Sequence, residues 1–244
     1  MHPLELSGVF KHFAGKVVLD DFSLGFSEGR VTALVGASGC GKSTVLKLCN
    51  GLLQPDAGVV HAFGEPLNYQ DLGETRRRMG YAVQGTGLFP HMTAANNIAI
   101  GAQASGWSTQ DIAVRIAELR TLMHLDEELL ERYPHELSGG QQQRVGLSRA
   151  MMLRPRILLL DEPFAAIDPI TRFDIHRQLQ ELLAAEPVTV LLVTHDMREA
   201  MLLAQQIVVM ADGKIRLNEA TAELQKRQPD LEPEVLLQSL MVTP

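Results

Sequence analysis

The feature that most restricts the fold is the stretch GASGCGKST, from Gly36 to Thr44, which matches the phosphate-loop pattern G-x-x-x-x-G-K-[ST]. The apolar run VTALV at 31–35 precedes it, and apolar residues at helical spacing follow it from Ser43 to Leu52. Strand, glycine-rich turn and helix in this order are the context in which such a loop binds phosphate. The sequence therefore predicts an α/β fold with a P-loop core, in which main-chain N–H groups and a helix start hold phosphate oxygens.

Each residue type in this loop has a chemical task. Lys42 would reach the β- and γ-phosphates of a nucleotide, and the Ser43 hydroxyl would bind Mg²⁺. An ordinary strand-to-helix turn is the alternative, and the strand–loop–helix context makes it the weaker interpretation. Cys40 is interpreted as a small loop residue rather than a redox site, because it lies inside the phosphate loop, and Cys40 and Cys49 fit no metal-binding spacing. The nucleotide-binding residues expected here are Gly36, Ser38, Gly39, Cys40, Gly41, Lys42, Ser43 and Thr44.

Two further apolar strands end in side chains that can take part in chemistry. The run ILLLDEP at 157–163 places Asp161 and Glu162 at the carboxyl edge of the sheet, where ligands of open α/β sheets bind. We expect Asp161 to hold Mg²⁺ and Glu162 to accept a proton from, or orient, the attacking water. The run VTVLLVTH at 188–195 brings His195 to the same edge, where it can contact the γ-phosphate. A turn after a strand for either acid, and a structural role for the histidine, are the alternatives.

Strands that alternate with helices predict a mainly parallel sheet with helices on its faces. The first thirty residues predict an N-terminal antiparallel β subdomain. The stretch 207–217 predicts a hairpin that turns at Asp212 and Gly213.

Helices are expected at 109–125, from Ser138 onward, and from Pro169 to about Ala185. On the first of these, one apolar face contains Ile112, Ile116, Leu119, Leu122 and Met123. Residues 85–155 contain helices and no convincing strand, which predicts a helical subdomain inserted into the sheet. A short tail at 218–244 would be helical in parts and interrupted by Pro229 and Pro233.

Length and composition limit the class of protein. The 244 residues suffice for one large α/β domain, and the net charge of -7 argues mildly against nucleic-acid binding. The basic run at 76–78 is more simply a solvated helix start than a binding patch. No stretch approaches the roughly 18 apolar residues that cross a bilayer, and the N-terminus lacks a signal-peptide pattern. We therefore expect a cytoplasmic protein that binds no nucleic acid.

A second glycine-rich turn, LSGGQQQR at 137–144, raises the question of why one domain would carry two. Ser138, Gly139 and Gly140 would form an exposed helix N-terminus and hence a second anion site, although a serine N-cap also explains the pattern. With this stretch added, the chain resembles the ATP-binding subunits of ABC transporters over about residues 4–217. The resemblance rests on several motifs in the right order.

The resemblance implies roles for further residues. Gln84 in GYAVQ corresponds to the Q-loop glutamine, a catalytic and metal-binding residue, and Asp168 in FAAID to the D-loop aspartate. His195 corresponds to the switch histidine, and Phe13 in FKHFAG would stack on adenine. ATP and Mg²⁺ are the implied cofactors. Two copies of the chain would pack head to tail, each ATP lying between the phosphate loop of one and Ser138, Gly139, Gly140 and Gln141 of the other.

The resemblance also implies a membrane partner. A permease helix would dock beside the Q-loop, where GTGLFPHMTAANNI at 85–98 offers Phe89, Pro90, His91 and Met92 as contacts; a buried loop is the alternative. The chain would then lie peripherally on the inner face of the cell membrane.

Three stretches narrow the family further. GLFPHMT at 87–93, DEPFAAIDPITR at 161–172 and THDMREAM at 194–201 are similar to the osmoprotectant importers, which take up glycine betaine, choline and related quaternary amines. This similarity implies a periplasmic or extracellular solute-binding protein that acts through the permease. Importers of amino acids, polyamines or other solutes are the alternative, and a soluble ABC ATPase outside transport is a weaker one.

Overall fold

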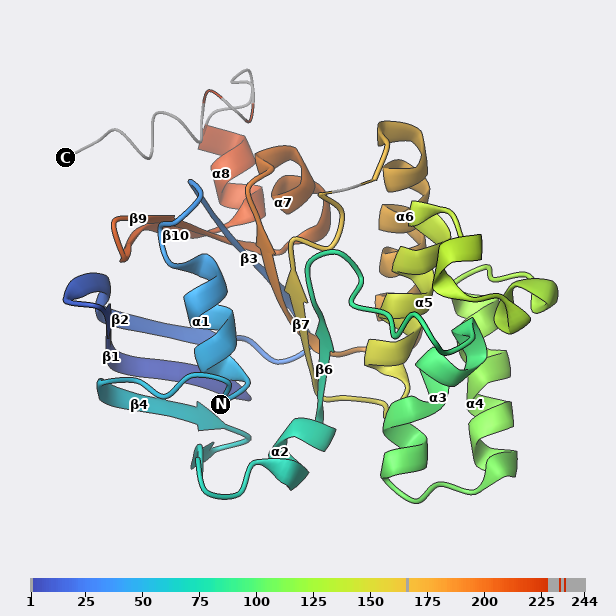
Figure 1. Cartoon of the computed structure of the whole chain (residues 1–244). Coiled ribbons are helices and arrows are strands. Elements are labelled where there is room, and N and C mark those ends of the chain that lie inside the picture. The colour runs from blue at the N-terminus through green and yellow to red at the C-terminus, as the bar shows by residue number, and fades with distance from the viewer. Residues whose placement is uncertain (1, 166, 228–232, 234, 236–244) are drawn as a thin grey trace. The chain divides into compact units, whose positions relative to one another are not determined.

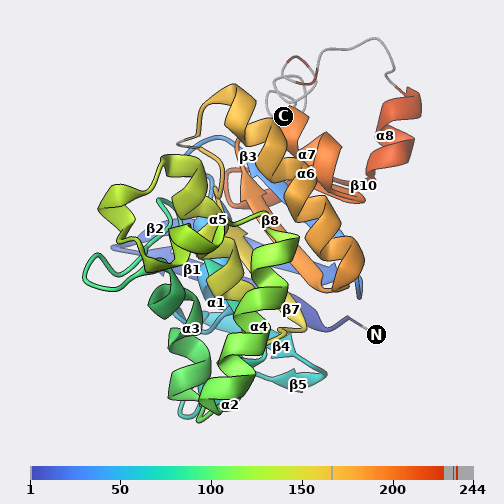
Figure 2. The ribbon, with the colours of Figure 1, turned by 90° about the vertical axis from the view of Figure 1, so that its right-hand side faces the viewer.

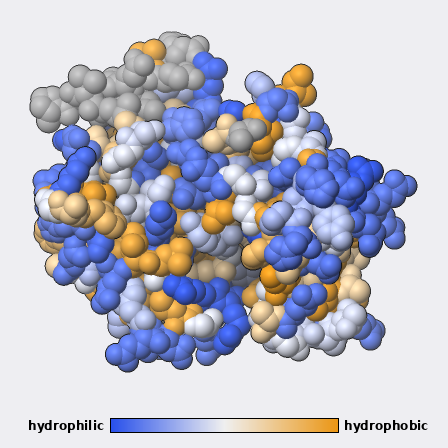
Figure 3. All heavy atoms as spheres, viewed as in Figure 1, coloured by the Kyte–Doolittle hydropathy of each residue, from blue (hydrophilic) through white to orange (hydrophobic). Residues whose placement is uncertain are grey.

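The computed structural model describes residues 2–165, 167–227, 233 and 235, and the chain folds into two compact units. The first unit contains residues 1–75 and 189–244, and the second contains residues 76–188. Among the described residues, no helix is both long enough and apolar enough to cross a membrane. On the face that Figure 3 shows, apolar side chains form several separate groups between hydrophilic ones.

The first unit begins with an antiparallel sheet, as the alternating first thirty residues predicted (Figure 1). Its strand order is β2-β1-β4-β5. The strands are β1 (Leu4–Phe13), β2 (Lys16–Phe26), β4 (Ala57–Ala62) and β5 (Glu65–Pro66). Leu4, Leu6 and Val9 of β1 are buried while the residues between them are partly exposed, so one face of this strand belongs to the core.

The other strands of the first unit surround β3 (Val31–Gly36). β3 pairs in parallel with β8 (Thr189–Thr194) and with β9 (Gln206–Ala211), and β9 pairs antiparallel with β10 (Lys214–Ala220). All residues of β3 and β8 are buried, because parallel strands covered on both faces need continuous apolar runs. The helices here are α1 (Lys42–Cys49), α7 (Met197–Leu203) and α8 (Thr221–Arg227).

The second unit is mainly helical. It contains one parallel strand pair, β6 (Met79–Ala82) with β7 (Ile157–Asp161). Its helices are α3 (Ala94–Ala104), α4 (Thr109–Leu122), η1 (Glu127–Glu131), η2 (Pro134–Glu136), α5 (Gly139–Met151) and α6 (Pro169–Ala185). α5 packs against α3, α4, α6 and β6, and Figure 2 shows α3, α4 and α5 close together. α5 is therefore the central helix of this unit.

Several sequence predictions need correction. The helix expected from Ser43 to Leu52 ends at Cys49, because Gly51 takes a left-handed φ of 70°. β10 continues to Ala220, since it pairs with β9 as far as Gln206, so the predicted tail begins with strand rather than helix. The basic run at 76–78 lies at the end of α2 (Gly73–Arg77) rather than at a helix start, and cations at a helix end interact favourably with the helix dipole. β4, β5, β6, α2, α3 and α7 were not predicted.

Most of the predicted elements agree with the structure. The 157–161 and 188–193 strands, the helix from Pro169 to Ala185 and the hairpin at Asp212 and Gly213 are all present. The mixed α/β fold class is confirmed. The boundaries predicted for the domain and its helical subdomain remain predictions, and Pro229 of the predicted tail lies outside the described residues.

Candidate functional site

The phosphate loop joins β3 to α1 in the first unit. Ala37, Ser38 and Gly39 are exposed at its tip, whereas its two end glycines are buried. At Gly36 a Cβ atom would lie 2.3 Å from the carbonyl oxygen of Met210, and Gly41 has a left-handed φ of 111°. Gly41 is the N-cap of α1 and no side chain caps this helix. Phosphate oxygens can therefore satisfy the first N–H groups of α1.

Lys42 lies across this loop. Its side chain is 5% exposed, and its Nζ donates hydrogen bonds to the carbonyl oxygens of Gly36 at 2.8 Å and Ala37 at 3.0 Å. Phosphate oxygens carry negative charge and are stronger acceptors than these carbonyls. The loop carbonyls thus hold the Lys42 ammonium beside the loop, and we expect a bound phosphate to replace them as its hydrogen-bond acceptor.

A cavity of about 490 Å³ adjoins the loop within the first unit. It is lined by Lys16, Val17 and Val18 of β2, by 37–40 of the phosphate loop and by 211–213 of the β9–β10 turn. Gly213 lets this turn approach β2, because a Cβ there would lie 2.5 Å from the carbonyl oxygen of Val18. The cavity is therefore a candidate for the part of a nucleotide that lies beyond its phosphates.

Phe13, the predicted adenine-stacking residue, is not among the residues that line this cavity. It lies at the end of β1 with 43% of its surface exposed, and Nζ of Lys11 is 5.5 Å from the centre of its ring. Its role in base stacking remains a prediction.

His195 lies at the same end of the first unit's parallel strands as the phosphate loop. Val35 of β3 is paired with Thr194 of β8, so the residues that follow each strand leave the sheet at one edge. Thr194 Oγ1 donates to Glu199 Oε2 at 3.1 Å and accepts the N–H of Asp196 at 3.0 Å. These contacts fix the start of α7 and leave the His195 side chain exposed at the edge.

Gln84 and Glu162 lie together in the second unit. β6 and β7 are parallel with Ala82 opposite Leu160, so Gln84 and Glu162 both lie just beyond the carboxyl ends of these strands. Gln84 Nε2 donates a hydrogen bond to Glu162 Oε2 at 3.4 Å. Glu162 has a φ of 44°, in the left-handed region that non-glycine residues rarely adopt. Such backbone conformations cost about 1–3 kcal/mol and cluster at functional sites.

Asp161 is buried at the end of β7 with 7% of its surface exposed. Burial, and then the charge of Asp161, raise the pKa of the Tyr81 phenol. The Asp161 carboxylate, the Ser43 hydroxyl and the amide oxygen of Gln84 are hard oxygen donors, the kind that Mg²⁺ prefers. Because Gln84 uses Nε2 toward Glu162, its amide oxygen is the atom suited to a cation. The donor chemistry of the predicted metal-binding residues fits Mg²⁺.

The second glycine-rich turn is a capped helix start. Ser138 is the N-cap of α5; its Oγ accepts the N–H of Gln141 at 3.3 Å, and Gln141 Oε1 accepts the N–H of Ser138 at 2.9 Å. Ser138, Gly139 and Gln141 are accessible, while a Cβ at Gly140 would lie 2.3 Å from Thr171 Cγ2. At Gly139 a Cβ would meet no atom within 4 Å among the described residues beyond its neighbours and its own helix, so packing within this part of the chain does not explain that glycine.

Asp168 caps α6 in the same way. Its Oδ1 accepts the N–H of Thr171 at 3.0 Å, and this hydrogen bond holds the pKa of the Asp168 carboxyl below its ordinary value. The side chain is exposed, so a capping role is compatible with a further role toward a ligand.

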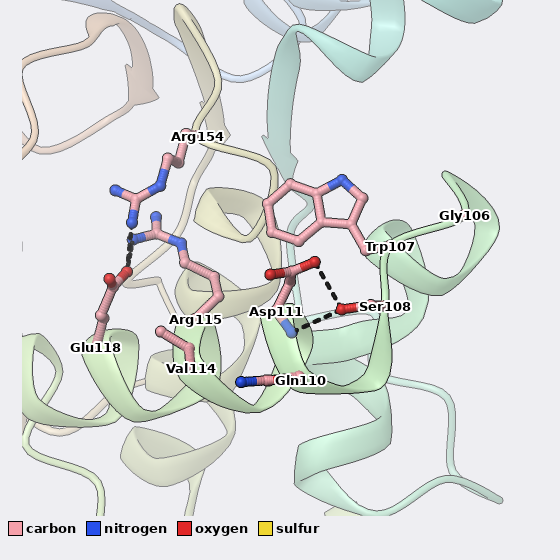
Figure 4. Close-up of a pocket in the computed structure, with 9 residues that line it drawn as sticks. All are labelled: Gly106, Trp107, Ser108, Gln110, Asp111, Val114, Arg115, Glu118 and Arg154. Atoms are coloured by element: carbon pink, nitrogen blue, oxygen red, sulfur yellow. Dashed lines mark hydrogen bonds and ion pairs between the residues drawn. The ribbon is translucent and has the colours of Figure 1, made fainter.

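Sequence reasoning missed several polar side chains that lie inside the second unit, among them the buried Asn97 and Arg115 and the partly buried Arg149. Arg115 borders a cavity of about 730 Å³ (Figure 4). Its guanidinium pairs with Glu118 and Glu186 and donates to the carbonyl oxygens of Met151 and Met152 at the end of α5. Helical spacing already put residue 115 on the apolar face of α4, between positions 112 and 119, which was the available signal.

The side chains around the cavity in Figure 4 stabilise the fold through ion pairs and a helix cap. Arg154 also pairs with Glu118 and Glu186, and Ser108 and Asp111 cap the start of α4. Burial lowers the pKa of Arg115, but hydrogen bonds and charges from Glu186 and Glu118 outweigh it and raise that pKa. The lining cations are matched by carboxylates, and none of the predicted site residues lies here.

Comparison with known proteins gives consistent matches. Residues 19–165 match the ABC transporter family. The chain is 46% identical over 212 residues to the glycine betaine uptake system ATP-binding protein YehX of Escherichia coli, covering 87% of this chain and 69% of that protein. It is 42% identical over 213 residues to the choline transport ATP-binding protein OpuBA of Bacillus subtilis, covering 87% of this chain and 56% of that protein. The chain thus spans little more than half the length of the Bacillus relative.

Iron importers match at similar identity. The Fe(3+) ions import ATP-binding protein FbpC of Mesorhizobium japonicum is 45% identical over 213 residues, with 86% of this chain and 58% of that protein covered. Among solved structures, the dimeric structure of MJ0796, a bacterial ABC transporter cassette, is 30% identical with a TM-score of 0.81, covering 89% of this chain and 98% of that chain. A post-hydrolysis dimer of the same cassette with ADP and Pi matches equally well. The predicted resemblance is confirmed.

Proposed function

This chain belongs to the ABC transporter family, and we propose that it is the ATP-hydrolysing motor subunit of an importer for quaternary amines such as glycine betaine and choline. One observation supports the motor function most directly: Lys42 lies across an exposed phosphate loop whose helix has no side-chain cap. Within the described residues, its Nζ donates hydrogen bonds only to carbonyl oxygens of the loop. This arrangement supports the proposal that the loop binds phosphate.

In the proposed reaction, the loop N–H groups and Lys42 hold the β- and γ-phosphates and offset their negative charge. Ser43 and Asp161, with the amide oxygen of Gln84, would hold Mg²⁺, which when bound neutralises developing charge on the phosphates. Glu162 accepts a proton from the attacking water, and its hydrogen bond with Gln84 orients the carboxylate for that task. His195 donates a hydrogen bond to the γ-phosphate from the edge of β8.

We propose that a second copy completes each site. The N–H groups of Gly139 and Gly140 at the start of α5 would approach the γ-phosphate bound by the partner. Support comes from the open space at Gly139, which a phosphate of another subunit could occupy only if no side chain were there. The solved dimers of a similar cassette are consistent with this arrangement.

The transported solute is proposed from similarity alone. Two relatives are described as serving glycine betaine uptake and choline transport, and the stretches at 87–93 and 161–172 support the same class. Iron import is the second candidate, because an Fe(3+) import relative is 45% identical. A permease, a solute-binding protein and a peripheral location on the cytoplasmic face of the membrane belong to this proposal.

ATPase measurements on the complex in reconstituted membranes test the solute. Glycine betaine or choline should raise the ATPase rate only when permease and solute-binding protein are present, since loaded binding protein favours the permease state in which two subunits can close. A quaternary amine is a cation held by cation–π attraction, so an uncharged isostere should stimulate poorly. Stimulation by Fe³⁺ or amino acids, with none by any quaternary amine, overturns the solute and leaves the motor standing.

The variant Glu162→Gln tests the chemistry. Glutamine keeps the shape but accepts no proton, so hydrolysis should fall by about 10²–10⁴-fold while ATP still binds. Steady-state phosphate release and equilibrium ATP binding measure the two effects separately. Hydrolysis near the wild-type rate would show that Glu162 is not the base.

A further inference from the structure

The segment that follows Gln84, residues 85–93, is held by the buried amide of Asn97 in α3. The side chain of Asn97 is 0% exposed. Its Oδ1 accepts the N–H of Phe89 at 2.8 Å, and its Nδ2 lies 3.1 Å from each of the carbonyl oxygens of Phe89, Met92 and Thr93. One side chain therefore fixes the main chain of this loop at three residues.

Arg149, in the last turn of α5, holds the other half of the loop. Its Nη2 donates to the carbonyl oxygen of Thr86 at 2.9 Å, and its Nη1 donates to that of Gly87 at 2.9 Å and to Asn97 Oδ1 at 3.4 Å. The guanidinium also lies 5.8 Å from the centre of the Phe89 ring. The guanidinium reaches the two carbonyls through two separate nitrogens held in a fixed planar fork, whereas a lysine would have to bond both from a single nitrogen at the end of a flexible chain.

The loop adopts a backbone that these contacts stabilise. Gly85, Thr86 and Gly87 have successive φ angles of 73°, 64° and 54°, and a β-branched residue such as Thr86 rarely enters this region. A Cβ at Gly87 would lie 2.4 Å from Val83 Cγ2. Hydrogen bonds from Arg149 go to Thr86 and Gly87, the carbonyls of this left-handed run.

The loop also has two functional ends. At one end Gln84 donates to Glu162. At the other, Phe89 is 41% exposed and lies edge-on to the ring of His91 at 6.0 Å, on the surface proposed for permease contact. α5, which carries Arg149, begins at Ser138 in the second glycine-rich turn and is about 20 Å long.

We propose that Arg149 and Asn97 form a clamp that makes residues 84–93 move as one piece, so that a permease contact at Phe89 changes the position of Gln84 beside Glu162. Arg149 is a positioning residue that links this loop to the helix starting at Ser138. The inference rests on the proposed function, because it takes the permease as the partner at Phe89.

The variant Arg149→Lys tests the clamp, with Arg154→Lys as the matched control, since Arg154 pairs with Glu118 and Glu186 instead of the loop. Hydrogen exchange of the isolated chain should be about 10-fold or more faster at the hydrogen-bonded amides of Gly87, Phe89 and Met92 in Arg149→Lys, and unchanged there in the control. In the reconstituted transporter, the ratio of solute-stimulated to unstimulated ATPase should fall toward one, and solute moved per ATP should fall with it. The control should keep both ratios.

The variant Gly87→Ala provides a second test if Arg149→Lys does not fold. It disturbs the loop from its own side, through the contact with Val83, and leaves α5 and α3 intact. It should lower the same two ratios. Wild-type exchange at 85–92 and wild-type coupling in either folded variant overturn the clamp. Absence of solute stimulation in the wild-type transporter contradicts the proposed function instead, and the exchange measurement then decides on the clamp.

Discussion

The two glycine-rich helix starts of this chain differ in how their N–H groups are satisfied. α1 begins at Gly41, with a φ of 111° and no side-chain cap. α5 begins at Ser138, where Ser138 and Gln141 satisfy each other's N–H groups in a capping box. The first start leaves its donors to water or a ligand, and the second satisfies them within its own chain.

Their glycines differ as well. Gly36, at the start of the phosphate loop, is required by its own chain, because a Cβ there would come within 2.3 Å of Met210 O. Apart from its sequence neighbours and its own helix backbone, Gly139 has no atom of the described residues within 4 Å of such a Cβ. The phosphate loop thus leaves its N–H donors for a ligand, whereas the start of α5 is capped within its own chain and open on its outer side. This difference is consistent with the proposed site shared between two subunits.

The largest effect is expected from damaging both helix starts in a mixed dimer. Lys42→Ala and Ser138→Arg should each abolish most ATPase activity as homodimers, since removing one charge-stabilising donor typically costs about 10²–10³-fold. In a dimer of one copy of each, both changes fall on one shared site and the other site is intact. ATPase measured on purified, differently tagged heterodimers should therefore recover a large part of the wild-type rate.

The control is a heterodimer of Lys42→Ala with wild type, which also retains one intact site and should match the mixed dimer. If the mixed dimer is as inactive as both homodimers while this control is active, the two helix starts do not share a site. α5 would then have to act within its own subunit.

Local patterns explain what could be predicted of this site. The phosphate loop, Asp161 and His195 follow short apolar runs, and the residue after a buried parallel strand reaches the sheet edge whatever the tertiary detail. The pairing of Gln84 with Glu162 depends on the register of β6 with β7, and β6 is a strand of four residues with no clear alternation in its sequence. Only the family resemblance pointed to Gln84.

The buried polar contacts could not be predicted in the same way. Asn97 and Arg149 are 52 positions apart in the sequence, and both bind the loop that follows Gln84. The left-handed residues of this loop include Thr86, and a threonine in a sequence does not predict that conformation. Arg115 was overlooked because a charged residue inside an apolar periodicity is normally assigned to the surface; its partner Glu186 lies 71 positions away. Such pairings are set by packing between helices, which single-sequence periodicity does not contain.

A smaller effect separates the glycines of the two helix starts. Gly139→Ala should leave the isolated chain as stable as wild type or up to about 1 kcal/mol more stable, because alanine is the better helix residue and finds open space. The matched variant Gly36→Ala should lose about 1–3 kcal/mol through overpacking against Met210. Urea unfolding of the monomer measures both.

ATPase activity completes this test. Gly139→Ala should lower the ATPase rate of the dimer in spite of its stable monomer, since the added methyl group lies where the partner's phosphate would approach. A Gly139→Ala protein with full activity would remove the reason for a glycine at this position and with it the support for close approach by a partner nucleotide.

The smallest effect concerns the charge of the helix cap, where α6 adds a third case. Asp168 caps α6 with a carboxylate whose pKa is lowered by the N–H of Thr171, whereas Ser138 caps α5 with a neutral hydroxyl. A lowered folded-state pKa gives stability that is complete above the ordinary aspartate pKa of about 3.9 and is lost as the pH falls through the lowered value.

An asparagine side chain would cap α6 equally well without titrating, so the variant Asp168→Asn should unfold like wild type at neutral pH and lose less stability than wild type in acid. Ser138→Ala should instead lose about 1 kcal/mol at every pH. Urea unfolding at pH 7 and at several values below pH 4 measures the difference in unfolding free energy between variant and wild type. Other acids, such as Asp56 with its pKa of about 2, are present in both proteins, so their contributions cancel in this difference. Equal acid sensitivity of Asp168→Asn and wild type would show that the charge of this cap does not stabilise the fold.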